Sequence, residues 1–544
     1  MPDKQMVAFR DFTGGLNTDK ADGNLAENEL RVADNVDFSE RGGLQKRKDT
    51  SIYEDYFTQQ VERVFEWNTS DGTTELMAVL EDGSLVRVST GETIFQLFGT
   101  HISWFVLQEY LYLVDGNNYY RIDDETFNYE TVPEQDVSGI REYGENFQAE
   151  LDVEHELEYG DIQTDSETVS LFDDPETTFE KGTDYEMSTE DYEEGKITPL
   201  SDGDMEDGEE YYIEYEYEFE GNNNLEPIRK CRYIIRHPKS YRIFAARNND
   251  DPDAIYYSEY NQPDNFKATS VIHPTTNDGP VQGIEILDEM LLVFYRNSIW
   301  AWRGLDPEQD AVWEKLPIKH GTFNHRTLET AIGAITFLDN NGVYALSPQK
   351  GTQNITDNKV TNEIKSISNK NEVHSIFDAG NNRYLLAYSD NTGRNDKILT
   401  FDWELGAFAR WTGLGDVNDF CYTQDGELLM ATDGAIKKLN QDYGNNNIDL
   451  NVLTRTMTLQ NPYLYKLIEN LFLTLNNYTN DTEATINIDD LDKLFDITND
   501  ITRNPLHEKG VEIQVKLSDN STENIILYDY GLEFKPVRNY REEL

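Results

Sequence analysis

The sequence predicts an all-β protein: a β-propeller with an inserted immunoglobulin-like β-sandwich module and a C-terminal, jelly-roll-like β-sandwich. Three observations predict this fold class. Short runs of β-branched and aromatic residues alternate with Asn, Asp, Pro and Gly clusters, as in paired strands. A strand–turn–strand unit recurs along the chain, and one acidic segment interrupts the recurrence. With 544 residues the chain is too long for a single core, so several domains are expected.

Residues 241 to 304 contain the clearest strand signals. Four apolar runs of the stretch are separated by polar turns, and they are Tyr241–Ala246, Ile255–Glu259, Met290–Tyr295 and Ser298–Trp302. The last two flank Arg296-Asn297, which is the spacing of a two-residue hairpin turn. We therefore predict two hairpins here.

The same unit recurs in both directions from this stretch. Further candidates, most of them built on an Asp-Gly or Asn-Gly turn, are residues 76–88, 110–122, 334–346, 384–403 and 427–439. Each is half of a propeller blade, and with the two hairpins above they number seven. The pattern predicts six or seven blades, although strand–turn–strand units also occur in other large β proteins.

Composition excludes several classes of protein. Aromatic residues make up 12% of the chain, which is typical of folded domains, and the net charge is −58. Free association with nucleic acid is not expected, because phosphate contacts need clustered cations. Cys231 and Cys421 are too few for a disulfide framework and are predicted to be buried. No secretory signal and no membrane span are recognised, so the protein is expected to be made, and to stay soluble, in a cytoplasm.

Residues 1 to 50 are predicted to be an N-terminal arm too small to fold alone. Gly14-Gly15 suggests a flexible lead-in, and residues 24 to 36 place Leu25, Leu30 and Ala33 on one face of a helix. Residues 37 to 48 are expected to turn back as a hairpin.

Several blocks of the chain resemble a family of tailed-bacteriophage virion proteins. The arm, "GGLN…NLAENELRVADNVDFSERGGLQKRKD", is similar to the start of tail nozzle (tail tubular protein B-like) and packaged-DNA stabilisation proteins. The blocks "YRIFAARNNDDPDAIYYSEYNQPDNF", "DGPVQGIEILDEMLLVFYRNSIWAWRG" and "AIGAITFLDNNGVYAL" resemble the family's propeller segment, and "YDYGLEFKPVRN" resembles its closing strand. Their order along the chain supports the resemblance.

An acidic insert breaks the propeller pattern. Residues 142 to 220 hold 30 Asp and Glu against two Lys, a net charge of −28. The sequence pattern nevertheless predicts strands at residues 168–172, 184–187, 195–198 and 211–219. In the last strand Ile213, Tyr215, Tyr217 and Phe219 alternate with Glu214, Glu216 and Glu218, which predicts a buried face and a ladder of carboxylates. The pieces "FEKGTDY" and "GKIT" resemble small immunoglobulin-like modules of phage proteins.

We divide the chain into five regions. They are an arm (1–50), the first part of the propeller (51–140), the inserted acidic module (141–225), the second part of the propeller (226–445) and a C-terminal sandwich or platform (446–544). In the last region, strands are expected at residues 467–475, 484–488, 511–517, 525–527 and 532–534.

Motif searches nominate no catalytic, cofactor-binding or metal residue. The spacing of His320 and His325 does not match a zinc motif, and no nucleophile elbow or phosphate-binding loop is present. Residues 202–208, 248–253 and 489–492 carry oxygen ligands, but their spacing fits solvated turns better than an EF-hand. A glycosidase pair cannot be selected from 104 acidic residues. The chain is therefore expected not to be an enzyme and to need no cofactor.

The resemblance implies a structural tail protein. Its subunits would form a ring, a hexamer as in the nozzle family, that retains the packaged genome and conducts DNA during ejection. Expected partners are copies of itself, head-to-tail adaptor proteins, tail fibre or distal tail proteins, and passing DNA without specific binding, all in the virion tail. Glu214, Glu216 and Glu218 are the candidate acidic wall. The alternatives are a carbohydrate-binding or degrading propeller in receptor recognition, and acidity that reflects a high-salt habitat.

Overall fold

The structure is a computed structural model that confirms the all-β fold class. It describes residues 4–39, 41–133, 138–172, 174–220, 224–307, 312–348, 351–391, 393–459, 461–497 and 499–537, and of these only the backbone for 138–141, 176, 218–220 and 496. Two compact units are present. The larger unit comprises residues 1–131, 227–256 and 272–544, and the inserted unit comprises residues 132–226 and 257–271.

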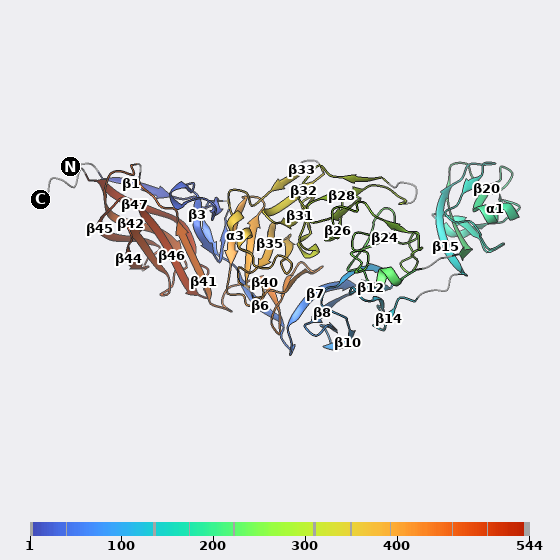
Figure 1. Cartoon of the computed structure of the whole chain (residues 1–544), viewed down its shortest axis with the longest axis horizontal. Helices are drawn as coiled ribbons and strands as arrows, with labels where there is room; N and C mark the ends of the chain where they lie inside the picture. Colours follow the sequence, from blue (N-terminus) through green and yellow to red (C-terminus); the bar gives the residue numbers. More distant parts are fainter. Residues whose placement is uncertain are drawn as a thin grey trace. The chain divides into compact units, whose positions relative to one another are not determined.

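Six four-stranded antiparallel sheets and the first four strands of a ten-stranded sheet, counted over the described residues, form seven blades of a propeller (Figure 1). Blade one consists of β7 (Val61–Asn68), β8 (Thr74–Leu80), β9 (Ser84–Arg87) and β10 (Glu92–Gln96). Blade two consists of β11 (Ser103–Leu107), β12 (Tyr110–Val114), β13 (Tyr119–Asp123) and β14 (Tyr129–Thr131). Blade three consists of β22 (Tyr233–Arg236), β23 (Ile243–Ala246), β24 (Ile255–Tyr257) and β25 (Val271–Ile272).

Blades four and five are β26 (Gly283–Leu287), β27 (Met290–Phe294), β28 (Ile299–Trp302) and β29 (Trp313–Lys315); and β30 (Glu329–Ala331), β31 (Ala334–Asp339), β32 (Gly342–Ser347) and β33 (Gly351–Asn354). Blades six and seven are β34 (His374–Asp378), β35 (Arg383–Tyr388), β36 (Lys397–Asp402) and β37 (Ala407–Trp411); and β38 (Asp419–Tyr422), β39 (Leu428–Ala431), β40 (Ile436–Gln441) and β6 (Asp49–Glu54).

The first strands of the blades surround the propeller axis and close the ring. Strand β34 of blade six contacts β30 of blade five and β38 of blade seven. Strand β38 in turn contacts β7, so that blade seven meets blade one. The ring is also closed through the chain itself, because β6 from the N-terminal region is the outer strand of blade seven and pairs with β40. Separating blades one and seven therefore requires breaking backbone hydrogen bonds.

The predicted hairpins are confirmed as paired strands within blades. Between β27 and β28 the N–H of Tyr295 donates to the carbonyl of Ser298 at 2.9 Å, which makes Arg296-Asn297 the two-residue turn that was expected. Sequence reasoning missed many first and last strands, such as β30 and β29 with three residues each. Such short strands carry too little periodicity to be recognised.

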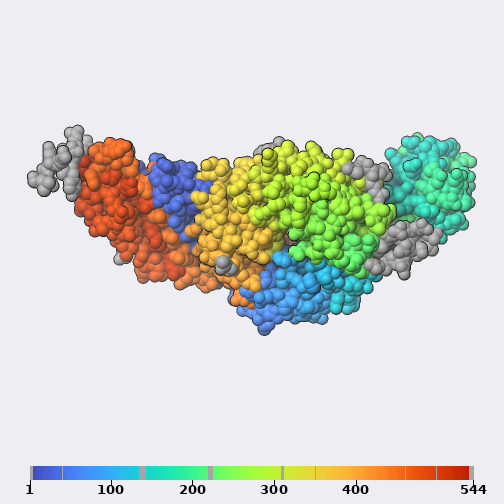
Figure 2. Space-filling model, in the orientation of Figure 1, coloured from blue at the N-terminus to red at the C-terminus, as the bar shows by residue number. Residues whose placement is uncertain are grey.

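The N-terminal arm is built into the larger unit as strands, and the predicted helix is wrong. The structure has a 3-10 turn, η1 (Asp22–Asn24), followed by β3 (Glu29–Asp34). Strand β3 lies between β37, to which it is parallel, and β41 (Ile448–Thr454), to which it is antiparallel. Pairing on both edges outweighs the helical spacing of Leu25, Leu30 and Ala33. Figure 2 shows these blue N-terminal residues between the orange C-terminal strands and blade six.

The glycines of the arm fit closely, which corrects the expectation of a flexible lead-in. Gly15 begins β2 (Gly15–Leu16), which pairs with β3, and has a φ of 66°. A Cβ at this position would lie 2.7 Å from the backbone nitrogen of Phe408. The hairpin expected over residues 37 to 48 is confirmed as β4 (Val36–Phe38) paired with β5 (Leu44–Lys46).

The C-terminal region contributes to two sheets that share one hydrophobic core with the arm and with blade six. One sheet has the order β4-β5-β47-β42-β45, with β1 (Gln5–Phe9) also on β47. The other sheet extends blade six through β3 to β41-β46-β43-β44. The new strands are β42 (Lys466–Asn476), β43 (Glu483–Ile488), β44 (Leu491–Asp496), β45 (Ile501–Gly510), β46 (Ile513–Ser521) and β47 (Ile526–Pro536). The two final strands that the sequence predicted are therefore one continuous strand, β47.

A buried ion pair ties the arm to the C-terminal strands. The ammonium of Lys46, at the end of β5, donates to the carboxylate of Asp519 and to the carbonyl of Ser521 at 2.9 Å. Both charged side chains are fully buried. Burial alone would raise the pKa of Asp519, but the hydrogen bonds from Lys46, Ser521 and Thr482 lower it overall.

The inserted unit has two antiparallel sheets, β15 (Ser138–Gln148), β21 (Glu210–Glu220), β17 (Thr168–Leu171) and β18 (Asp174–Phe179), and β16 (His155–Glu156), β20 (Lys196–Pro199) and β19 (Tyr185–Glu186). Helix α1 (Thr189–Glu194) begins at Ser188 with a capping box. The predicted module ends at residue 225, whereas this unit also includes residues 257 to 271, where Gln262 donates to the hydroxyl of Tyr217 at 2.5 Å. This long-range addition carries no local sequence signal.

Three further helices lie in or beside the propeller: α2 (Glu226–Arg229), α3 (Thr361–Ser366) and the 3-10 turn η2 (His325–Thr327). None of the helices in the described part of the chain is long and apolar enough to span a bilayer.

Candidate functional site

Strand β21 separates its side chains as the sequence predicts. Tyr211, Ile213, Tyr215 and Tyr217 are buried in the core of the inserted unit, whereas Glu214 and Glu216 are exposed. The side chain of Glu218 lies outside the described part of the structure. The alternation follows from the period of two along a strand with one face packed and one face in water.

The neighbouring strand adds another carboxylate to this face. Glu142 of β15 is paired in register with Glu216 and is also exposed. Within the described residues, Glu142, Glu214 and Glu216 form no ion pair. We call these three side chains the acidic face. Like charges directly across a strand pair are destabilising, so the sheet carries an electrostatic cost here.

Both lysines of residues 142 to 220 are used elsewhere. Lys181 lies 2.7 Å from Asp165, and Lys196 lies 2.9 Å from Glu154 and 2.6 Å from Glu194. Neither lysine offsets the charge of the acidic face, and none of the three glutamates forms an ion pair with a side chain that the structure describes.

The centre of the propeller is a second candidate site. A cavity of about 660 Å³ is lined by residues from the first strand of every blade, among them Arg63, Ser103, Glu285, Ser375 and Asp419. The channel could not be predicted from the sequence, because its polar lining residues are scattered over seven short strands that are far apart in the chain. The one detectable signal is a charged residue inside an apolar strand, as in Val61-Glu-Arg-Val-Phe.

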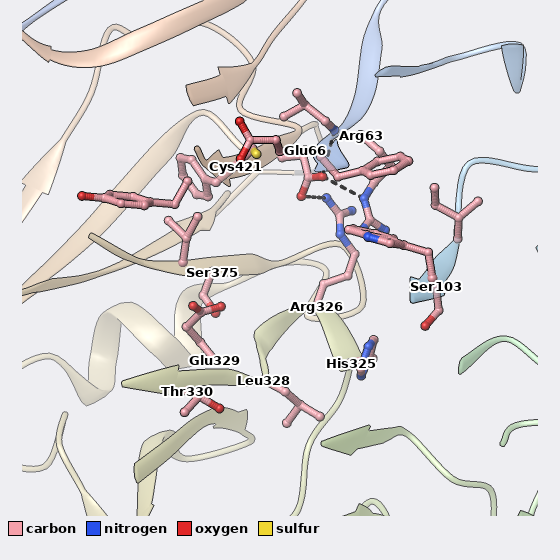
Figure 3. Close-up of a pocket in the computed structure, with 18 of the residues that line it drawn as sticks. Arg63, Glu66, Ser103, His325, Arg326, Leu328, Glu329, Thr330, Ser375 and Cys421 are labelled. Atoms are coloured by element: carbon pink, nitrogen blue, oxygen red, sulfur yellow. Dashed lines mark hydrogen bonds and ion pairs between the residues drawn. The ribbon is translucent and has the colours of Figure 1, made fainter. Parts of the chain in front are cut away.

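A buried carboxylate links three blades across the channel. Asp419 accepts a hydrogen bond from Arg63 at 2.8 Å and another from Arg326 at 3.0 Å (Figure 3). It also accepts from the backbone N–H of Val64 at 3.2 Å. Burial would raise the pKa of Asp419, but the two guanidinium groups outweigh burial and lower the pKa to about 2. Asp419 is therefore ionised at neutral pH.

Two other carboxyl groups line the channel, and neither forms an ion pair within the part of the chain that the structure describes. Burial raises the pKa of Glu285 to about 7 and that of Glu329 to about 8, with a smaller contribution to Glu329 from the charge of Glu285. Among the described residues, the contacts that favour their ionised forms are backbone hydrogen bonds, such as the one from Ile286 N–H to Glu285 at 3.0 Å. These two groups can exchange protons in the neutral range, whereas Asp419 cannot.

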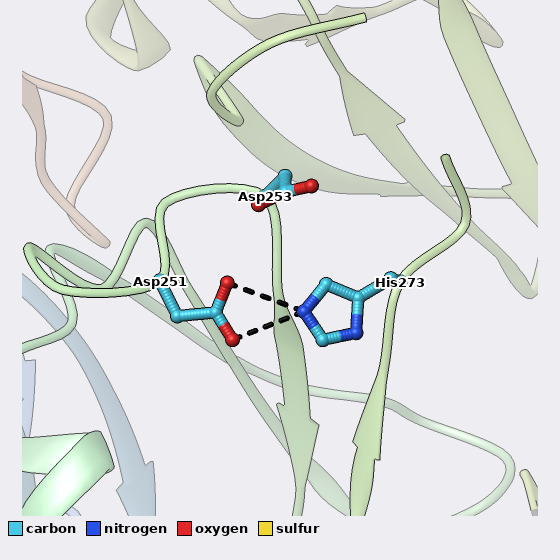
Figure 4. A group of neighbouring side chains, drawn as sticks. All are labelled: Asp251, Asp253 and His273. Atoms are coloured by element: carbon cyan, nitrogen blue, oxygen red, sulfur yellow. Dashed lines mark hydrogen bonds and ion pairs between the residues drawn. The ribbon is translucent and has the colours of Figure 1, made fainter. Parts of the chain in front are cut away.

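A third cluster lies on the loop that follows β23. Nε2 of His273 is 3.0 and 3.2 Å from the two carboxylate oxygens of Asp251, and Asp253 lies beside them (Figure 4). Asn248 accepts hydrogen bonds from the N–H groups of Asp250 and Asp251, which is an Asx turn. The ligand atoms of the three side chains all lie within 4.8 Å of one another, a spacing that could hold a metal ion, although exposed acidic groups are common without one.

Two histidines weighed as metal ligands have other partners. His320 lies 2.8 Å from Asp339 and stacks on Tyr344, and His325 packs against Tyr233. Cys231 and Cys421 are free and buried, as predicted.

Comparison with protein-family models found no match, and comparison with curated proteins found none either. Among solved structures, PorZ, a bacterial surface component of the type-IX secretion system of Porphyromonas gingivalis, matches 84% of this chain and 46% of its own at 12% identity and a TM-score of 0.37. The extracellular domain of BT4673 from B. thetaiotaomicron matches 95% and 63% at 9% identity and a TM-score of 0.39. The N-terminal domain of Nup159 matches 75% and 98% at 10% identity and a TM-score of 0.33.

The chain thus spans 46% of the length of PorZ and 63% of the length of the BT4673 domain. Likenesses at this level carry no argument about function.

Proposed function

We propose that the protein is a structural subunit of the tail of a tailed bacteriophage, of the nozzle type. Copies of the chain form a ring through which the genome passes, and the ring docks on a head-to-tail adaptor. The resemblance of the sequence blocks between Gly14 and Arg538 supports this proposal, and the architecture of the chain agrees with it.

The observation that carries the proposal is the acidic face. Glu142, Glu214 and Glu216 are exposed, adjacent and without a cation among the described residues. A wall of this kind gains no counterion release from DNA, which carries one negative charge per roughly 1.7 Å of duplex axis. Repulsion acts over about 8 Å at physiological ionic strength, so it matters where the wall approaches the DNA closely.

The larger unit has an architecture suited to a tail subunit that must resist mechanical force. Blade six continues through β3 into the C-terminal sheet, with Asp34 paired in register to Arg410 and bonded to it through the side chains at 2.8 Å. Separating the propeller from the C-terminal strands requires shearing this sheet and opening the buried Lys46–Asp519 pair. A side-chain interface alone would part more easily.

The first test is electron microscopy of the purified full-length chain, together with its mass in solution. We expect rings with sixfold symmetry, alone or on the adaptor. A chain that stays monomeric at every concentration and is missing from purified virions would overturn the proposal.

The second test separates the acidic face from net charge. Virions carrying Glu142→Gln, Glu214→Gln and Glu216→Gln should eject DNA more slowly at low salt, and the difference should shrink as salt is added. The matched control, which also removes three charges, is Glu109→Gln with Glu125→Gln and Glu130→Gln, since these exposed carboxylates lie in blade two. An equal effect of the control would show that net charge, not the acidic face, matters.

A further inference from the structure

One mouth of the propeller channel is rich in arginine. A cavity of about 360 Å³ shares Arg63 and Arg326 with the main channel, and Arg232 and Arg247 complete its cationic lining. These four residues come from β7, the residue before β22, the residue after β23 and η2. Glu372 is the one carboxylate among the lining residues.

Four arginines in one small cavity are unusual in this chain, which has 46 basic and 104 acidic residues. Arg63 and Arg326 share the single carboxylate of Asp419. The side chains of Arg232 and Arg247 form no hydrogen bond or ion pair among the residues that the structure describes, and Nη1 of Arg247 is buried without a partner. Arg232 is exposed at this mouth and Arg247 is half-buried, so the unsatisfied group is Nη1 of Arg247, a buried donor whose lack of an acceptor costs free energy.

The backbone also holds Arg247 in a conformation that is rare for its residue type. Its φ is 62°, directly after the end of β23, and the next residue, Asn248, is fixed by a 2.7 Å hydrogen bond from its side chain to the carbonyl of Pro227. Strained residues of this kind gather at ligand sites, where the surrounding structure can hold them.

The charged groups of this mouth influence one another. Desolvation by the surrounding protein, followed by the charges of Arg326, Arg63 and Arg232, lowers the pKa of His101 to about 4, and part of this side chain stays exposed. Burial and Arg232 likewise lower the pKa of Arg247. An anion in the cavity would relieve this repulsion.

We propose that this arginine-lined mouth binds an oxyanion of the phosphate class, either free phosphate or the phosphoryl group of a small ester. The planar donor fork of a guanidinium matches phosphate oxygens in pairs, and several arginines can engage one anion from different sides. The volume is at the lower end of small-molecule sites, which favours a compact ligand. Arg232 and Arg247 bind the anion, while the carboxylate of Asp419 competes with it for Arg63 and Arg326.

The binding test uses thermal unfolding of the full-length chain with inorganic phosphate at low millimolar concentration, against sodium chloride of equal ionic strength. Phosphate should raise the unfolding temperature in a saturable way. Glycerol phosphate, added in a parallel series, separates the two sources: tighter binding of the ester assigns a phosphoryl ligand, and tighter binding of inorganic phosphate assigns the free ion. Titration calorimetry gives both affinities directly.

Arg232→Gln and Arg247→Gln should each weaken phosphate binding about 10- to 100-fold, the loss expected for hydrogen bonds to a charged group. Arg10→Gln is the matched control, because Arg10 is an arginine with an exposed side chain. It should bind phosphate like the unchanged protein. Equal shifts in all of these proteins would mean that phosphate acts as a stabilising salt, and the proposal would be wrong.

A measurement without phosphate distinguishes binding from a structural role. In chloride, Arg247→Gln should unfold at the same temperature as the unchanged protein or at a higher one, because like-charge repulsion is removed. A lower unfolding temperature in chloride, with the response to phosphate kept, would assign Arg247 to folding and overturn the proposal.

Discussion

The inserted unit and the propeller channel place acidic side chains in opposite environments. On β21, Glu214 and Glu216 lie in water without a partner among the described residues. In the channel, Asp419 is held between two arginines, whereas the half-buried Glu285 and Glu329 form no ion pair with any described residue. The exposed glutamates of β21 create a negative electrostatic potential at the surface. The carboxyl groups of the channel determine how many protons the interior of the propeller binds at a given pH. The net charge of −58 therefore combines acidic residues whose environments, and whose effects on the protein, differ.

This contrast leads to different expectations for mutations. An exposed carboxylate is stabilised by water in both the folded and the unfolded chain, so its replacement changes the free energy of unfolding little. A buried charge depends on its partner, and loss of the partner leaves it uncompensated. The predictions below test this difference, starting with the most deeply buried charges.

The largest effect is expected at the fully buried Lys46–Asp519 pair. Lys46→Met should lower the free energy of unfolding by about 3–5 kcal/mol, because it leaves Asp519 charged and without a counterion. Urea unfolding of the larger unit measures this. Lys239→Met is the matched control, since Lys239 forms a 3.0 Å ion pair with Glu289 in which both side chains are more than half exposed. The control should lose less than about 1 kcal/mol. Similar losses for both variants would contradict the contrast.

The second effect concerns the charge bridge of the channel. Asp419→Asn should cost about 2–3 kcal/mol, because Arg63 and Arg326 lose the carboxylate that pairs them. The same variant should bind phosphate more tightly, since a competing anion is removed. Urea unfolding and phosphate titration check the two expectations separately. Unchanged stability would show that water in the channel replaces the carboxylate.

A pH dependence follows from Glu285 and Glu329. Their folded pKa values, about 7 and about 8, lie above the ordinary value of 4.5, so the folded protein binds more protons than the unfolded chain in this range. Their contribution to stability is fully present below pH 4.5 and is lost as the pH rises through 7 and 8. Glu285→Gln with Glu329→Gln should reduce the fall in unfolding temperature between pH 5 and pH 8. A slope equal to that of the unchanged protein would exclude these groups as its cause.

The sequence predicted local features better than long-range ones. The hairpin at Arg296-Asn297 and the alternation along β21 were readable because turn chemistry and a period of two are local. The helix expected around Leu30 was wrong because β3 is fixed by strands hundreds of residues away, β37 and β41. For the same reason the channel was missed: Arg63, Arg326 and Asp419 meet only after the ring has closed.

The smallest effect is expected on the acidic face, where β21 provides its own control. Glu214→Gln and Glu216→Gln should each change the free energy of unfolding by less than about 0.5 kcal/mol, the usual range for exposed positions. The change should be toward higher stability, since Glu216 faces Glu142 across the strand pair. Tyr215, between them, is buried, and its hydroxyl donates to Glu145 at 2.8 Å and accepts from the N–H of Tyr159 at 3.2 Å.

Tyr215→Phe should therefore cost about 1 kcal/mol, because two polar groups lose their partner although the ring is kept. Thermal and urea unfolding of the full-length chain, followed by a probe in the inserted unit, measure all three variants. The contrast also predicts a difference in salt dependence. The gain from Glu216→Gln should fall as salt screens the repulsion, whereas the loss from Tyr215→Phe should not change. If the glutamate variants lose as much stability as Tyr215→Phe, the exposed carboxylates stabilise the fold. Their role would then not be limited to repelling DNA that passes the acidic face.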